Sequence, residues 1–290
     1  MTQTADQQEW SPNSDRLSRR DFSRLAQFIN GYSGIKMPPN KITMVEGRLR
    51  RRVRDTGYPN LAEYCRYLFE NGGLESETVH IIDAVTTNKT EFFREVEHFK
   101  ILANTVLPGF VGARDPNGRI SLKFWSAACS TGAEPYTIAM VVADFAKKMP
   151  GLQASILATD LSTEVLEEAL LGIYPESMIA PVPMPMRRNY LLKAKDRSRG
   201  VVRIVPELRK MMKFARLNLM ATSYPVDRDM HVIFCRNILI YFDRPTQEAV
   251  LSRLCDHLIP GGYLFLGHSE SLSGFSLPLA SIGKTAFRRI

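Results

Sequence analysis

The fold is decided by the stretch Phe124-Trp-Ser-Ala-Ala-Cys-Ser-Thr-Gly-Ala-Glu-Pro-Tyr136 and, one helix later, Ser155-Ile-Leu-Ala-Thr-Asp160. Its first residues predict a short apolar strand, and the small polar residues up to Gly132 predict a turn. An amphipathic helix follows. It has proline in its first turn, where a missing backbone N–H costs no helical hydrogen bond. A second apolar strand then ends on an acid. The order strand, turn, helix, strand predicts an α/β unit.

The acid at the tip of the second strand, Asp160, is placed to bind the two ribose hydroxyls of an adenosine-containing cofactor. The turn before the helix has one glycine, Gly132, and lacks the three-glycine fingerprint of pyrophosphate binders. A nucleoside without phosphates does not need that fingerprint. On this stretch alone, an ordinary crossover with a functionless polar turn remains an equal alternative.

Composition predicts a globular protein outside the membrane. The chain has 290 residues, of which 44% are hydrophobic, enough for one large or two modest domains. It has no run of eighteen apolar residues and no apolar signal segment, so we expect a cytoplasmic location. A formal net charge of +8 favours an acidic partner: nucleic acid, a membrane surface or a protein. The cysteines lie far apart, without a CxxC pair or a histidine at ligand spacing, so we expect neither disulfides nor a zinc site.

The first part of the chain predicts a small helical domain, residues 16–85, after a disordered lead-in over residues 1–15. Apolar residues at helical spacing predict helices over residues 18–32, 40–56, 61–69 and 75–85. We interpret Ser18 with Asp21 as a capping box, and Asn40 as the cap of the second helix.

The second helix carries a basic stripe beside its apolar one. A charge run is usually a solvated face. Between Lys36 and Arg54, however, seven basic residues accompany one acid, Glu46, so the i, i+4 neutralisation of a merely soluble helix is absent. We therefore favour a docking surface for an acidic partner. The stripe consists of Lys41, Arg48, Arg51 and Arg52.

Polar residues also recur between and after the predicted strands. Asn88 and Thr90 can hydrogen-bond a ligand, and Arg94 can clamp a carboxylate. The alternative, compatible with the first, is that this segment caps a helix over residues 95–107. Since strand carboxyl ends converge on one crevice of an open α/β sheet, we expect the strand-end polar residues to share a ligand site. They are Ser126 to Gly132, Asp160, Asn218 and Arg236-Asn237.

Together these motifs resemble the CheR family of chemotaxis receptor methyltransferases, in the family's order and over almost the whole chain after residue 16. The motifs are Asn88-x-Thr90-x-Phe92-Phe93-Arg94, Ala127 to Tyr136, Ala158-Thr159-Asp160, Asn218-Leu219 and Cys235-Arg236-Asn237-x-x-x-Tyr241-Phe242. The resemblance implies an α/β, Rossmann-like S-adenosylmethionine-dependent methyltransferase domain over residues 86–290, with a small antiparallel β subdomain inserted at about 189–214. It implies methyl transfer to glutamates on the cytoplasmic domain of methyl-accepting chemotaxis receptors.

The resemblance also implies a role for each matching residue. Asp160 would take the ribose of S-adenosylmethionine, Asn218-Leu219 would lie by the adenine, and Arg94 and Tyr241 would border the reacting centre. The basic helix, with Arg54 added to its stripe, would meet the acidic methylation helices of the receptor. The implied cofactor contacts are Asn88, Thr90, Arg94, Glu134, Asp160, Asn218, Leu219, Arg236 and Asn237.

The implied chemistry needs little from the protein besides positioning. A glutamate carboxylate is ionised at neutral pH, so attack on a sulfonium methyl group needs no strong general base. We therefore expect neither a catalytic triad nor a metal, and we expect Arg94 and Tyr241 to orient a carboxylate by hydrogen bonding.

The sequence departs from the family pattern in two places. Ala133 stands where many members carry Glu or Gln, which leaves Glu134 as the acid of the turn. The segment from Lys193 to Gly200 lacks the paired glycines of members that bind a receptor's C-terminal pentapeptide tether, so we predict a tether-independent enzyme.

Two other functions compete with this one. The first is a non-catalytic S-adenosylmethionine-binding adaptor that docks on receptors or on a signalling regulator; Arg94, Asp160 and Tyr241 argue against it. The second is a nucleic-acid methyltransferase, which the basic charge suggests. Base-methylating enzymes usually carry an Asn/Asp-Pro-Pro-aromatic motif, and the corresponding strand end here reads Arg236-Asn-Ile-Leu239. We therefore expect no nucleic-acid partner. Because the chain has no run of eighteen apolar residues, we also expect no insertion into the membrane.

Overall fold

The computed structural model describes residues 16–112 and 115–290 and divides into two compact units after Thr86. The lead-in predicted over residues 1–15 lies outside the described residues. Within the described part, no helix is both long and apolar enough to cross a membrane.

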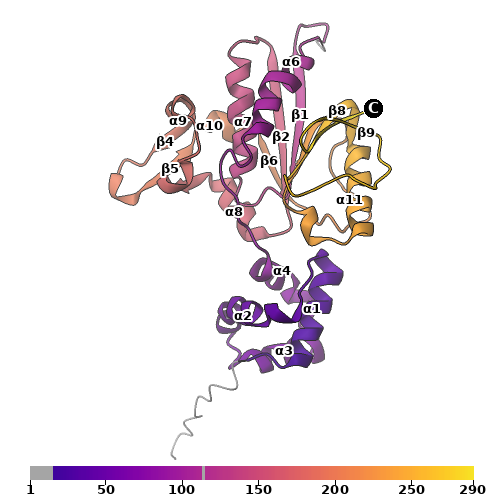
Figure 1. Ribbon diagram of the computed structural model, residues 1–290. Helices are drawn as coiled ribbons and strands as arrows, with labels where there is room; N and C mark the ends of the chain where they lie inside the picture. The colour runs from indigo at the N-terminus through magenta and orange to yellow at the C-terminus, as the bar shows by residue number, and fades with distance from the viewer. Residues whose placement is uncertain (1–15, 113–114) are drawn as a thin grey trace, which may run out of the picture. The chain divides into compact units, whose positions relative to one another are not determined.

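The first unit is all helical (Figure 1). Ser18 caps its first helix by accepting a hydrogen bond from Asp21 N at 3.0 Å, which confirms the cap but only half of the predicted capping box. The Asp21 carboxylate accepts the Ser18 hydroxyl at 2.6 Å instead of the Ser18 backbone N–H. The prediction for Asn40 is wrong: this residue lies inside a 3₁₀ turn, and the second helix starts after it without a side-chain cap. The helices are α1 (Arg19–Ser33), η1 (Pro39–Lys41), α2 (Ile42–Thr56), α3 (Leu61–Glu70) and α4 (Leu74–Val85).

A buried carboxylate ties three helices of this unit together. Glu77 on α4 accepts two hydrogen bonds of 2.7 Å from the Arg52 guanidinium on α2 and one of 2.8 Å from the Tyr64 hydroxyl on α3. The hydrogen bonds from Arg52 lower the pKa of Glu77, against the opposing effect of burial, and Tyr64 adds to the lowering. Glu77 is therefore a stabilising carboxylate whose contribution requires its negative charge.

The second unit is built on a seven-stranded sheet in the order β6-β2-β1-β7-β8-β10-β9 (Figure 1). The first five of these strands pair in parallel, and β10 runs antiparallel to both neighbours. The parallel strands therefore end at one edge of the sheet. The strands are β1 (Ile120–Ala127), β2 (Leu152–Asp160), β6 (Met212–Arg216), β7 (Met230–Cys235), β8 (Leu258–Leu266), β9 (Leu279–Gly283) and β10 (Ala286–Arg289).

The sheet is buried on both faces. Successive residues of each strand point to opposite faces, and helices pack on both of them. On β1, Phe124 packs in the core shared with α7 (Ala133–Ala146), while Trp125 packs in the core shared with α11 (Arg244–His257). The first core also receives the helical segment made of α5 (Glu97–Ile101), a π-helical turn and α6 (Leu107–Gly109). These layers hold the strand ends rigidly in place.

A separate three-stranded antiparallel sheet, in the order β3-β5-β4, lies in the chain between α8 (Thr163–Leu171) and β6. Its first strand precedes the range 189–214 in which we expected the insertion, because a three-residue strand that ends in proline and is followed by three more prolines gives no clear periodic signal. The elements of this segment are β3 (Ile173–Pro175), η3 (Glu176–Ile179), α9 (Met184–Tyr190), β4 (Leu191–Lys193), η4 (Arg197–Arg199), β5 (Val201–Ile204) and α10 (Pro206–Arg209).

The Glu77 network predicts an acid-sensitive helical unit. Because its pKa is lower when folded than unfolded, Glu77 stabilises the unit above its unfolded pKa of about 4.3, and this contribution is lost as the pH falls below that value. Hydrogen exchange of the α2 and α4 amides, corrected for the intrinsic pH effect, should accelerate with acidification in the wild type. Glu77→Gln should raise exchange already at pH 7 and flatten the pH dependence. Glu75→Gln, at an exposed position of the same helix, should match the wild type; an equal response of both variants would contradict the assignment.

Candidate active site

The turn after β1 joins two of the sequence-predicted site residues. Ser130 donates its backbone N–H to Asp160 Oδ2 at 2.8 Å and its hydroxyl to the carbonyl oxygen of Asn88 at 2.9 Å. The turn is tight, with Ala128 at φ 66° and Ser130 at φ 50°, in a region that non-glycine residues seldom adopt. One residue of the turn thus brings the loop after Thr86 and the tip of β2 together.

Asp160 is held by the backbone on both sides. Its second oxygen, Oδ1, accepts the N–H of Ser162 at 3.0 Å, at the start of α8. Ser162 stands at the N-cap position of α8, but its hydroxyl makes no capping bond. Its Oγ is buried and has no hydrogen-bond partner among the described residues. Asp160 therefore presents an oriented carboxylate at the tip of β2.

A second cluster centres on the buried guanidinium of Arg236, which directly follows β7. Its Nη1 donates to Glu134 Oε2 at 2.9 Å, and its Nη2 donates to Glu95 Oε2 at 3.0 Å and to the carbonyl oxygen of Arg94. Glu134 is itself fixed by the Ser126 hydroxyl at 2.7 Å. The cluster joins the β1 turn, the segment around Arg94 and the end of β7.

The two carboxyl groups on Arg236 respond differently to burial. Burial opposes ionisation of Glu95, but the charge of Arg236 and hydrogen bonds from His268 and Asn237 outweigh it and lower the pKa of Glu95 to about 2. For Glu134, burial prevails over Arg236 and raises the pKa. Glu95 is therefore the firmly ionised partner of Arg236 at neutral pH.

Glu270 shapes the turn that follows β7. Its buried carboxylate accepts four backbone N–H groups, those of Asn237 at 2.9 Å, Ile238 at 2.9 Å, Leu239 at 2.7 Å and Gly267 at 2.6 Å. Burial raises the pKa of Glu270, and the four backbone hydrogen bonds oppose that shift. Glu270 was not among the residues predicted from the sequence; its only local mark is an acid four residues after the end of β8.

The other predicted residues do not form one contact network among the described residues. Asn218 accepts the N–H of Met220 at 2.9 Å, and Leu219 is buried in the α11-side core. Arg94 donates to the carbonyl oxygen of Lys89 at 3.0 Å. Thr90 is half-buried, and so is Tyr241 at the end of η5 (Leu239–Tyr241). Among the described residues, no hydrogen bond joins the side chains of Arg94 and Tyr241.

The predicted basic stripe is only partly available to a partner. Besides Arg52, which binds Glu77, Arg48 is engaged within its unit and donates to the carbonyl oxygens of Val85 and Thr86 at 2.7 Å. Lys41 is half-buried, whereas Arg51 and Arg54 are exposed. The side chain of Arg51 is 79% exposed and lies 3.9 Å from Asp55, a weak i, i+4 pair just outside the stretch considered above.

One surface cavity of about 560 Å³ lies elsewhere in the second unit. Its lining comes from β1, β2, β6 and β7 before their carboxyl ends and from the segment around Pro225, and includes Lys123, Ser155 and Lys213. None of the candidate site residues lines it.

Comparison with known families identifies the class of this site. Residues 88–287 match the family model described as the S-adenosylmethionine-binding domain of CheR methyltransferase, and residues 20–86 match the one described as its all-alpha domain. The larger unit is thus an S-adenosylmethionine-dependent methyltransferase domain. The chain belongs to the CheR methyltransferase family, which confirms the resemblance inferred from its motifs.

Curated relatives are similar over nearly their full lengths. The chain is 38% identical to a chemotaxis protein methyltransferase of Escherichia coli, over 93% of this chain and 91% of that protein. It is 40% identical to one of Klebsiella aerogenes, over 93% and 90%. It is 36% identical to one of Borreliella burgdorferi, over 89% and 90%.

The Glu270 turn gives a direct prediction. In Glu270→Gln the amide nitrogen cannot accept, so at least one pair of backbone N–H donors loses its acceptor. The chain should lose about 1–3 kcal/mol of stability, and its affinity for S-adenosylmethionine should fall because the Asn237 turn loosens. Thermal unfolding and calorimetry measure these effects.

The matched control is Glu248→Gln, at an exposed position of α11, which should leave both quantities unchanged. Wild-type stability and affinity in Glu270→Gln would show that the carboxylate does not shape this turn.

Proposed function

We propose that this protein transfers the methyl group of S-adenosylmethionine to glutamate side chains of methyl-accepting chemotaxis receptors, forming methyl esters for sensory adaptation. Membership of the CheR family and the names of the curated relatives support the proposal. The observation that carries it is the meeting of Asn88, Ser130 and Asp160 at the strand ends. A nucleoside could there find acceptors for its hydroxyls beside the Arg236 cluster.

The residues at this edge fit the cofactor. Two buried polar atoms, Ser162 Oγ and Arg236 Nε, have no partner within the described chain, and a bound ligand or water could satisfy them. In the proposed arrangement Asp160 binds the ribose and Asn218-Leu219 lie by the adenine. The remaining contacts would come from Asn88, Thr90, Arg94, Glu134, Arg236 and Asn237.

Bound S-adenosylmethionine supplies a methyl group on a positively charged sulfur. A glutamate oxygen of the receptor forms the new bond to the methyl carbon as the bond to sulfur breaks, and no proton has to move. Arg94 and Tyr241 orient the carboxylate by hydrogen bonds. Holding the oxygen in line with the methyl carbon can supply up to about 7–11 kcal/mol of the barrier.

The test is to incubate the protein with S-adenosylmethionine carrying a labelled methyl group and with membranes of its own cell. The proposal expects an alkali-labile label, as methyl esters give, on receptor bands. Cofactor binding without transfer would instead favour a docking adaptor, and alkali-stable label would exclude glutamate esters.

The exposed cations of α2 are the proposed receptor-docking surface. Arg51→Glu combined with Arg54→Glu should slow receptor methylation by about tenfold or more, since two attractive charges become repulsive. Affinity for S-adenosylmethionine should not change. The matched control is Arg20→Glu combined with Arg66→Glu, at exposed positions of α1 and α3. Equal rates in the two double variants would rule out the α2 surface as the docking site. Arg52 is unsuitable for this test because it holds Glu77.

The role of Tyr241 predicts a modest kinetic loss. Tyr241→Phe removes one hydroxyl hydrogen bond worth about 0.5–1.5 kcal/mol, so turnover should fall about 2- to 10-fold in a tritiated-methyl transfer assay. Tyr58→Phe in the helical unit should keep the wild-type rate. Unchanged turnover in Tyr241→Phe would count against an orienting role.

A further inference from the structure

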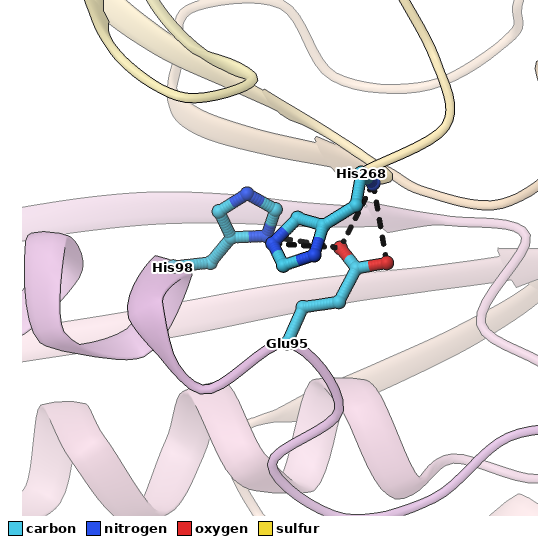
Figure 2. A group of neighbouring side chains, drawn as sticks. All are labelled: Glu95, His98 and His268. Atoms are coloured by element: carbon cyan, nitrogen blue, oxygen red, sulfur yellow. Dashed lines mark hydrogen bonds and ion pairs between the residues drawn. The ribbon is translucent and has the colours of Figure 1, made fainter.

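Three side chains that the proposed mechanism does not use, Glu95, His98 and His268, converge on one another (Figure 2). One of them, Glu95, also accepts a hydrogen bond from Arg236. Glu95 precedes α5, His98 lies in α5, and His268 follows β8. Glu95 Oε2 lies 3.5 Å from His98 Nδ1 and 3.8 Å from His268 Nε2. The three potential ligand atoms all lie within 4.8 Å of one another.

The surroundings of His98 orient one of its ring nitrogens toward the cluster. Its side chain is 1% exposed, and its Nε2 hydrogen-bonds Thr285 Oγ1 at 2.9 Å. Its Nδ1 is buried and faces Glu95 (Figure 2), and it has no hydrogen-bond partner within the described part of the chain. In the neutral tautomer whose Nε2 proton is donated to Thr285 Oγ1, Nδ1 carries a lone pair directed into the cluster.

The donor set and its spacing match a metal site. Two imidazoles and one carboxylate are typical ligands of Zn²⁺ and neighbouring transition metals. Metal–ligand bonds of about 2.0–2.2 Å place the ligand atoms of a tetrahedral site roughly 3.3–3.5 Å apart. The distances from Glu95 Oε2 to His98 Nδ1 and to His268 Nε2 need little change to reach this spacing. His268, whose side chain is 39% exposed, can move to close the remaining gap to His98.

We propose that Glu95, His98 and His268 form a binding site for one divalent transition-metal ion of the Zn²⁺ class. With three protein ligands, the remaining coordination position is open to water. The ion would link the segment that carries Arg94 to the turn after β8. It is not part of methyl transfer, which needs no Lewis acid.

The neighbouring charges set the strength of this site. Glu95 Oε2 already accepts from Arg236, so a metal ion competes with the guanidinium for that oxygen. Arg236 keeps its second carboxylate, Glu134, at 2.9 Å. We therefore expect reversible binding, weaker than in a structural zinc site, whose ligands have no competing cation.

The test uses the full chain without a histidine tag and titrates it with Zn²⁺ in competition with a chromophoric chelator. The wild type should bind one equivalent, and His268→Ala should bind at least tenfold more weakly. His80→Ala, at an exposed position of α4 outside the cluster, should bind like the wild type. Absence of stoichiometric binding, equal binding by His268→Ala, or loss of binding in His80→Ala would overturn the proposal.

A second measurement addresses coordination directly. Co²⁺ should give the wild type a visible absorption band of a low-symmetry nitrogen and oxygen site, and His268→Ala should lose it. Glu95→Gln and His98→Gln should lose it too, provided that their circular dichroism is native. If either variant unfolds, the partly exposed His268 decides the outcome alone. A band that persists in His268→Ala would contradict the assignment.

Discussion

The rest of the catalytic unit depends on the hydrogen bonds and ion pairs that the buried guanidinium of Arg236 makes. It holds Glu134 from the first crossover, Glu95 and the carbonyl oxygen of Arg94 from the segment before α5, and it sits at the end of β7. Removing one partner of such a buried pair typically costs about 3–5 kcal/mol, because an uncompensated charge remains. The same cation therefore fixes three segments far apart in the sequence, and it fixes them where the strands end.

Backbone strain accompanies this arrangement. Among the described residues, seven non-glycine residues have positive φ, and five of them lie on the three segments that meet here. Strained conformations persist where the surroundings impose them, and they cluster at ligand sites. Two of the five are held by carboxylates: Asp160 binds the backbone N–H of Ser130, and Glu270 binds that of Asn237. The strained residues are Phe93, Glu95, Ala128, Ser130 and Asn237.

Sequence patterns within a few residues predicted the helices and strands. The features that the sequence did not predict depend on contacts between residues far apart in the chain. Helical periodicity and the Ser18 cap are encoded within a few residues, and the carboxyl ends of parallel strands must share one edge, so the location of Asp160 and Arg236 could be predicted. Nothing local reveals that Glu270 binds a turn thirty residues away or that Glu95 and His268 meet. The strand β9 was also missed, because it is mostly exposed and lacks clear alternation. Likewise, the sequence presents Arg52 as a free cation, whereas the fold pairs it with Glu77.

In this account the strand-end residues hold the nucleoside of S-adenosylmethionine. Calorimetry with S-adenosylhomocysteine measures this binding most directly. Asp160→Asn should weaken binding by about tenfold or more, since charge-assisted hydrogen bonds contribute about 1.5–3 kcal/mol each. Asp256→Asn, at an exposed position of α11, should bind like the wild type. Wild-type affinity in a natively folded Asp160→Asn would contradict the account.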